Sequence, residues 1–113
     1  MNNTEVVNTA SKYIVKTTGA GSETDQVLVN ANDLTGGTNK SLVSLIECYY
    51  LIEGTGILTI SAGDETLPLD GKGKYGLRPG QLKFGNDKIF NLTTDSNVKR
   101  YLLVTEFRRE SNG

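Results

Sequence analysis

The sequence lacks histidine and tryptophan, and it contains one cysteine, Cys48, and two prolines. Without histidine the chain has no imidazole general base, no histidine-ligated metal site and no switch of charge near neutral pH. One cysteine cannot form an intrachain disulfide or a zinc site with several cysteine ligands. These absences exclude many classes of enzyme. We therefore expect a non-enzymatic protein with no cofactor and no metal.

The sequence also lacks an excess of either charge and any long hydrophobic run. Twelve basic and 13 acidic residues leave a net charge of −1, which gives no electrostatic reason to bind nucleic acid. The apolar stretches are only a few residues long, too short to cross a bilayer. Residues 1–5 lack the basic and apolar regions of a signal peptide. We expect an unexported chain that is made in a reducing cytosol and binds neither nucleic acid nor membranes.

The residues that are abundant favour β-structure. Valine, isoleucine, threonine, tyrosine and phenylalanine dominate the segments between turns, and such side chains fit a pleated sheet better than a helix. The 13 glycines occur at intervals, as turn residues do. Apolar residues make up 36% of the chain, below the usual range of roughly 45–50%, so the core should be modest. A chain of 113 residues corresponds to one domain.

Alternation and turn residues together predict about eight strands. We place them at residues 12–18, 25–31, 40–53, 57–62, 66–69, 72–77, 88–94 and 98–108. Glycine-rich or Asx-rich turns separate them, and we interpret 54–56, 63–65 and 70–71 as hairpin turns. Strands at this regular spacing predict an all-β fold, either a small jelly-roll-like β-sandwich or a flattened barrel, over residues 12–110.

The alternation within each strand divides its residues between two faces. In the first strand, Tyr13, Val15 and Thr17 alternate with Lys12, Ile14 and Lys16, and in the last strand Tyr101, Leu103, Thr105 and Phe107 alternate with Leu102, Val104 and Glu106. In the second strand, Val27, Val29 and Ala31 share one face. The longest strand, 40–53, has a largely apolar face on its even positions, although helical spacing is a competing interpretation there. We expect Ile46, Leu58 and Leu103 to be buried between the two sheets.

Two segments are candidates for binding a partner. Residues 1–11 have too few apolar groups to order themselves by burial, so we interpret them as an N-terminal arm with Val6 and Val7 as anchors on another subunit. The alternative is that this arm packs within the molecule as an edge strand. The loop 77–86 is longer than the hairpin turns, and it carries Arg78, Lys83 and Phe84 as candidate contacts.

Several motifs resemble catalytic or ligand sites but have simpler interpretations. The run 71–76, GKGKYG, lacks the spacing and the following helix of a phosphate-binding loop and predicts a solvated turn. Glu47 and Glu53 would lie about 20 Å apart along one strand, too far for a two-carboxylate mechanism. The loop carboxylates show no calcium-loop spacing, and they are Asp33, Asp64, Asp70 and Asp87.

The basic residues Lys72, Lys74, Arg78 and Lys83 cluster in one stretch of the chain. A nucleic-acid surface has this pattern, but the overall pI of about 5.4 disfavours it. A cationic patch that faces an acidic protein partner accounts for the same residues. Cys48, mid-strand among apolar neighbours, is interpreted as a buried structural cysteine.

The order of these segments resembles that of the small β-rich virion proteins of tailed bacteriophages, of the head decoration or cement type. The resemblance covers residues 41–108. It is carried by the runs LIECYY (45–50), GTGILTI (54–60), LDGKGK (69–74), LTT (92–94) and YLLV (101–104), followed by Arg108.

The resemblance implies a structural protein on the capsid surface of a virion. Its partners would be the major capsid protein and further copies of this chain, and each copy would stabilise the shell by bridging capsid subunits. Two alternatives remain open. One is another virion position, such as a tail, head–tail joining or fibre-base component. The other is a glycan-binding attachment module, which the absence of tryptophan disfavours, because such modules expose flat aromatic faces.

Overall fold

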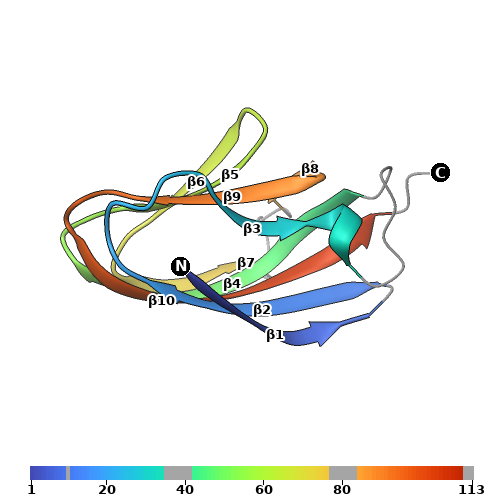
Figure 1. Cartoon of the computed structure of the whole chain (residues 1–113), viewed down its shortest axis with the longest axis horizontal. Helices are drawn as coiled ribbons and strands as arrows, with labels where there is room; N and C mark the ends of the chain where they lie inside the picture. Colours follow the sequence, from blue (N-terminus) through green and yellow to red (C-terminus); the bar gives the residue numbers. More distant parts are fainter. Residues whose placement is uncertain (10, 35–41, 77–83, 111–113) are drawn as a thin grey trace.

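The computed structural model describes residues 1–9, 11–34, 42–76 and 84–110 of the chain. Two antiparallel sheets lie one above the other (Figure 1). Sheet A has the order β1 (Asn2–Asn8), β2 (Lys12–Gly19), β10 (Val98–Glu110), β4 (Leu42–Gly54) and β7 (Lys72–Gly76), and β8 (Phe84–Asp87) also pairs with β4. Sheet B has the order β3 (Gln26–Asn30), β9 (Ile89–Thr94), β5 (Leu58–Ala62) and β6 (Glu65–Leu69). A short 3-10 helix, η1 (Ala31–Asp33), follows β3.

The strand pairing is that of a jelly roll. Leaving β1 and β8 aside, each strand pairs antiparallel with the strand at the mirrored place in the chain order: β2 with β10, β3 with β9, β4 with β7 and β5 with β6. These pairs go alternately to sheet A and sheet B, so that the chain forms a double-sheet jelly roll. The prediction of a small all-β sandwich is therefore confirmed. The described residues add β1 and β8 to the expected eight strands.

The core lies between the two sheets and follows the predicted alternation in most strands. On β10 the predicted core residue Leu103 is buried, and so are the residues in phase with it, such as Phe107; on β2 the buried face carries Tyr13, Val15 and Thr17. On sheet B, Leu58 is fully buried, and so are Ile60, Phe90 and Leu92. The rings of Phe90 and Phe107 meet edge to face with centroids 5.0 Å apart, which joins the two sheets at the centre of the core.

The predicted burial of Ile46 is wrong, because β4 contains a β-bulge. Glu106 and Phe107 of β10 are consecutive, but they pair with Glu47 and Leu45, so Ile46 is an extra residue. The bulge shifts the inward face from odd to even positions. Leu45 and Cys48 are consequently both buried, whereas Ile46 is only partly buried.

A second bulge changes the expected face of β3. Val27 pairs with Asn91 and Val29 pairs with Phe90, so Leu28 is the extra residue. Leu28 and Val29 are buried, while Val27, which we expected on the same face as Val29 and Ala31, is 49% exposed. In both strands, one inserted residue is enough to move a predicted core side chain outward.

The N-terminal residues form the edge strand β1, which is the alternative stated from the sequence. Asn2–Asn8 pair with β2, and the register shifts between Glu5 and Val7. Val6 is the bulged residue and is 59% exposed, while Val7 is partly buried. The strand is ordered by its backbone ladder to β2 and needs little apolar burial.

Two of the three predicted hairpin turns are connections between the sheets. Residues 54–56 lead from β4 of sheet A to β5 of sheet B, and residues 70–71 lead from β6 back to β7. Only Gly63 and Asp64 join paired neighbours, β5 and β6. Asp95 links the β4–β5 and β9–β10 connections. Its carboxylate accepts hydrogen bonds from the backbone N–H groups of Ile57 and Asn97, each at 3.0 Å.

Candidate protein-binding face

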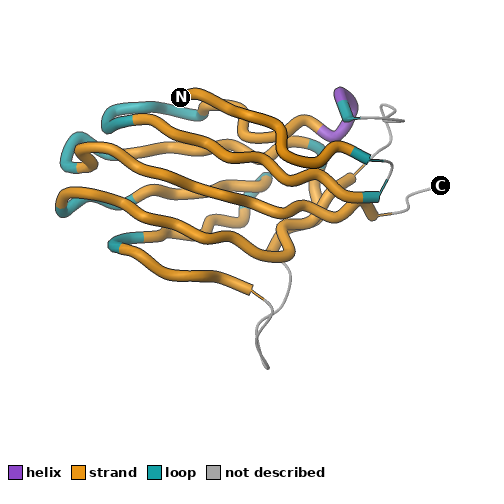
Figure 2. Tube along the Cα trace, turned by 90° about the horizontal axis from the view of Figure 1, so that it is seen from below, coloured by secondary structure: helices purple, strands orange, loops and turns teal. Residues whose placement is uncertain are grey.

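The two central strands of sheet A carry apolar side chains on both faces. On the outer face, Tyr49 and Leu51 of β4 lie directly opposite Val104 and Leu102 of β10. We call these four residues the apolar block. Tyr49 is 49% exposed and Leu51 is 43% exposed, while Leu102 and Val104 are partly buried. Figure 2 looks onto this sheet and shows β10 and β4 at its centre.

A groove runs over the apolar block. Its volume is about 300 Å³, and its lining is formed by Tyr49, Tyr50, Leu51, Lys72, Gly73, Leu102 and Val104. A smaller hollow of about 120 Å³ shares Leu51 and Leu102 with it and extends toward the ion pair between Arg100 and Glu53. Together they form a continuous, mostly apolar surface, which is the character of a recognition site.

Lysines lie on both sides of the apolar block. Lys16 of β2 is opposite Val104, and on the other side Lys74 and Lys72 of β7 are opposite Tyr49 and Leu51. The Lys74 ammonium lies 5.2 Å from the centroid of the Tyr49 ring, within the range of a cation–π contact. The face therefore has an apolar centre with a cationic rim along two sides.

The ends of the apolar block, along the strand direction, are charged differently from its sides. At one end Arg100 forms an ion pair with Glu53, and this contact raises the pKa of the guanidinium. At the other end Glu47 and Glu106 lie directly opposite each other. The acidic end and the cationic sides give the face a defined orientation for any partner.

The outer face of sheet B provides an internal comparison. At its centre Thr59 lies opposite Thr93, and Ser61 lies opposite Asn91 and Thr66. These are small, uncharged polar side chains, although Pro68 also lies opposite Thr59 and the exposed Val27 lies opposite Asn91. Among the described strands, the centre of the outer face thus carries four adjacent apolar side chains in sheet A and mostly polar ones in sheet B, and a contiguous exposed apolar patch is typical of a protein–protein contact.

The structure describes only part of the site that the sequence predicts. Val6 and Val7 lie on β1, with Val6 exposed. Arg78 and Lys83 lie outside the described residues, and Phe84 begins β8, although its side chain is not described. Lys72 and Lys74 of the expected cationic cluster do line the groove side of sheet A. The apolar block itself was missed, and the signal for it was the apolar residues on both faces of the strands 40–53 and 98–108.

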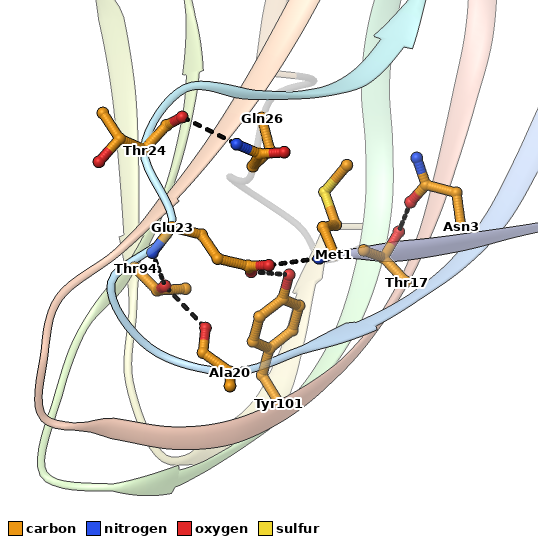
Figure 3. Close-up of polar contacts among 9 residues, drawn as sticks. All are labelled: Met1, Asn3, Thr17, Ala20, Glu23, Thr24, Gln26, Thr94 and Tyr101. Carbon is orange, nitrogen blue, oxygen red and sulfur yellow. Dashed lines mark hydrogen bonds and ion pairs between the residues drawn. The ribbon is translucent and has the colours of Figure 1, made fainter.

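A polar cluster joins the start of β1 to the connection between β2 and β3 through Glu23. Glu23 accepts a hydrogen bond of 2.6 Å from the Tyr101 hydroxyl and forms an ion pair with the Met1 amino group (Figure 3). The Glu23 backbone N–H donates to the Thr94 hydroxyl, which in turn donates to the Ala20 carbonyl. Burial and the Glu23 hydrogen bond raise the pKa of Tyr101, so this phenol stays protonated and serves as a structural donor.

The described residues contain no activated cysteine and no cluster of metal ligands. Burial raises the pKa of the Cys48 thiol to about 12, which leaves almost no thiolate at neutral pH. Among residues 1–9, 11–34, 42–76 and 84–110, no three His, Cys, Asp or Glu side chains gather as a metal site. In the same ranges, no helix has the length and apolarity that a membrane span requires.

Comparisons with protein-family models, with curated proteins and with solved structures find no match to this chain.

Proposed function

We propose that this chain is a non-enzymatic structural protein of a tailed-bacteriophage virion, which decorates the capsid by binding the major capsid protein lattice through the outer face of sheet A. The observation that carries the proposal is the apolar block at the centre of that face. The resemblance of residues 41–108 to head decoration proteins points to the capsid as the partner. Jelly-roll sandwiches also occur in viral capsid proteins, which is consistent with this role.

The edges of both sheets favour binding through a face. In the order of the described strands, β1 is one edge of sheet A, β7 and β8 together form the other edge beside β4, and β3 and β6 are the edges of sheet B. Four of these five strands carry a feature that opposes pairing with another strand. These features are the bulges at Val6 and Leu28, Pro68 within β6, and Lys72 and Lys74 on β7. Strand addition at these four strands is thus disfavoured.

The size of the molecule suits this role. A standard interface buries about 800 Å² on each partner, which is roughly an eighth of the 6192 Å² of accessible surface here. The apolar block supplies the desolvated centre of such an interface, and the lysines supply its polar rim. Each copy that bridges two capsid subunits adds a contact that must break before the shell ruptures. Modest free energies then sum over the many copies on one shell.

The first experiment locates the chain in virions. Particles purified by density from the producing culture are probed with an antibody raised against this protein, by blotting and by immunogold microscopy. We expect the chain in the particles and gold on the heads. Gold confined to the tails would contradict a capsid role and support the tail alternative. Absence from the particles would overturn the proposal.

The second experiment tests the face. Heads from phage with this gene deleted are incubated with purified protein, and occupancy is measured. Replacing Leu51 and Leu102 together by serine should lower occupancy strongly, because it removes the desolvated centre of the interface. The matched control replaces Thr59 and Thr93 of sheet B by serine and should bind as the wild type does. Melting curves verify that both variants are folded. Equal binding by the two would contradict docking through sheet A.

A further inference from the structure

The structure points to the chemistry of the partner surface. We infer that the outer face of sheet A binds a surface of another protein that is apolar at its centre and carries carboxylates on two opposite sides. The inference rests on the proposed function for the identity of the particle, and it deepens that function by naming what the capsid surface must present. It is carried by the apolar block and by the lysines that lie on both sides of it.

The spacing of the lysines sets the spacing of their partners. Lys16 lies on β2 and Lys74 on β7, and three strand intervals separate these strands across sheet A. At the ordinary distance between neighbouring strands this is about 14 Å. Carboxylates on the partner therefore need a similar separation, with apolar side chains between them to fill the groove above Tyr49 and Leu51.

A second copy whose strands run parallel or antiparallel to these does not meet that requirement. If two copies pack face to face with the two-fold axis along the strands, Lys16 of one copy faces Lys74 of the other, and Glu47 faces Glu106. If the axis runs across the strands, Lys72 faces Lys74, although Glu106 then faces Arg100. In neither arrangement do the lysines meet carboxylates, and like charges face each other at an interface, which is unfavourable. We therefore take a different protein as the occupant, and a second copy is the alternative that the crosslinking below would reveal.

The acidic end of the face fixes the orientation of the partner. Glu47 and Glu106 lie beyond Tyr49 and Val104, and they repel carboxylates placed along the strand direction. The opposite end is already neutralised by the ion pair of Arg100 with Glu53. Directly around the apolar block, anionic groups are consequently favoured at the two sides, next to β2 and β7, and basic residues follow again beyond the glutamates, at Arg108 and Lys12. The apolar contacts supply most of the affinity, and the charges supply specificity and a faster association rate.

The first test measures the charge requirement on heads from the gene-deleted phage. Reversing Lys72 and Lys74 together to glutamate should weaken binding by about tenfold or more. The affinity of this variant should also depend less on NaCl concentration than the affinity of the wild type does. Lys88→Glu is the control, because Lys88 lies on the connection from β8 of sheet A to β9 of sheet B and does not line the groove. It should bind as the wild type does. Unchanged affinity and unchanged salt dependence in the double variant would overturn the inference.

The second test identifies what covers the face. A photo-crosslinking phenylalanine analogue is placed at Tyr49, with Thr59 of sheet B as the control position, and crosslinked peptides from loaded heads are sequenced. We expect a capsid peptide with apolar residues flanked by Asp or Glu, from position 49 only. Crosslinks to another copy of this chain, to nucleic acid or to a basic peptide would overturn the inference.

The two proposals fail in different ways. Binding to heads that is indifferent to Lys72 and Lys74 would refute the acidic partner and leave the capsid role intact. A chain that is absent from virions, but whose position 49 crosslinks to an acidic apolar surface of another protein in lysate from the producing culture, would refute the capsid role and support the inferred chemistry.

Discussion

The close approach of β7 to the bulge in β4 gives a sharp prediction for Gly76. This residue has φ +98°, and a Cβ atom added there would lie 2.1 Å from the Ile46 carbonyl oxygen and 2.9 Å from the Glu47 Cα. Both atoms belong to the backbone, so no side-chain rotation relieves the overlap. Gly76→Ala therefore requires β7 to move away from β4 at the point where Gly76 pairs with Glu47.

The magnitude follows from two contributions. A non-glycine residue in a left-handed conformation costs about 1–2 kcal/mol. Forcing a methyl group into a packed site costs about 1–3 kcal/mol more, since the strand must shift and its last ladder hydrogen bond weakens. Gly76→Ala should thus lower the free energy of unfolding by roughly 2–5 kcal/mol, near the upper end of single substitutions.

Gly71 supplies the matched control. It also has a positive φ, +65°, but a Cβ atom there meets no heavy atom within 4 Å. Gly71→Ala should therefore show only the conformational cost of about 1–2 kcal/mol, and Gly71→Asn should recover part of it, because asparagine tolerates this conformation. Urea denaturation measures all three variants, and hydrogen exchange should show faster exchange in β7 for Gly76→Ala. Equal losses for the two alanine variants would refute the predicted clash with Ile46.

Three further predictions concern buried polar groups. Thr105→Val should leave the melting temperature unchanged or raise it, because the buried Thr105 hydroxyl has no hydrogen-bond partner among the described residues. The Tyr101 pKa is raised by burial and by Glu23, so the folded state keeps this proton to higher pH than the unfolded chain. Stability should consequently fall as pH rises above about 10, and Tyr101→Phe should show a shallower fall in melts from pH 8 to 11. Cys48, with its thiol pKa raised to about 12, should not react with Ellman's reagent at pH 8 until denaturant is added; rapid reaction of the native protein would contradict its burial.

The sequence was most informative where alternation is uninterrupted. In β2 and in β10 from Tyr101 onward the period of two is uninterrupted, so Leu103 was correctly predicted as buried, and Tyr13, Val15 and Phe107 lie on the buried faces of the predicted alternation. In β4 and β3 a single inserted residue reverses the phase, and no local feature of the sequence marks the insertion. Ile46 and Val27 were misplaced for this reason.

Which strands pair with each other could not be predicted from the local sequence either. The turn at residues 54–56 has the glycines of a hairpin, yet it joins two different sheets, because β4 pairs with β7 and β10 while β5 pairs with β6 and β9. The strand β1 shows no apolar period because its order comes from backbone hydrogen bonds to β2. In both cases long-range pairing decides what the local residues leave open.

The apolar block illustrates the same limit for function. Tyr49 and Leu51 are some fifty residues from Leu102 and Val104, and only the register of β4 against β10 brings them together. The sequence indicated a cationic cluster that includes Lys72 and Lys74, and the structure places these two beside the block. Charge clustering within one segment is visible in a sequence, whereas an apolar surface assembled from two segments requires the pairing.

The position of the apolar block also bears on how binding would work. It lies on β4 and β10, which at 13 residues each are the longest strands and are hydrogen-bonded on both sides. Their inward residues, such as Cys48 and Leu103, are fixed in the core, so the outward residues are held in place before any partner arrives. A disordered arm would lose conformational entropy on binding, whereas a preorganised face loses little. The proposed binding at many equivalent positions on a shell would therefore cost less conformational entropy through this rigid face than through a disordered arm.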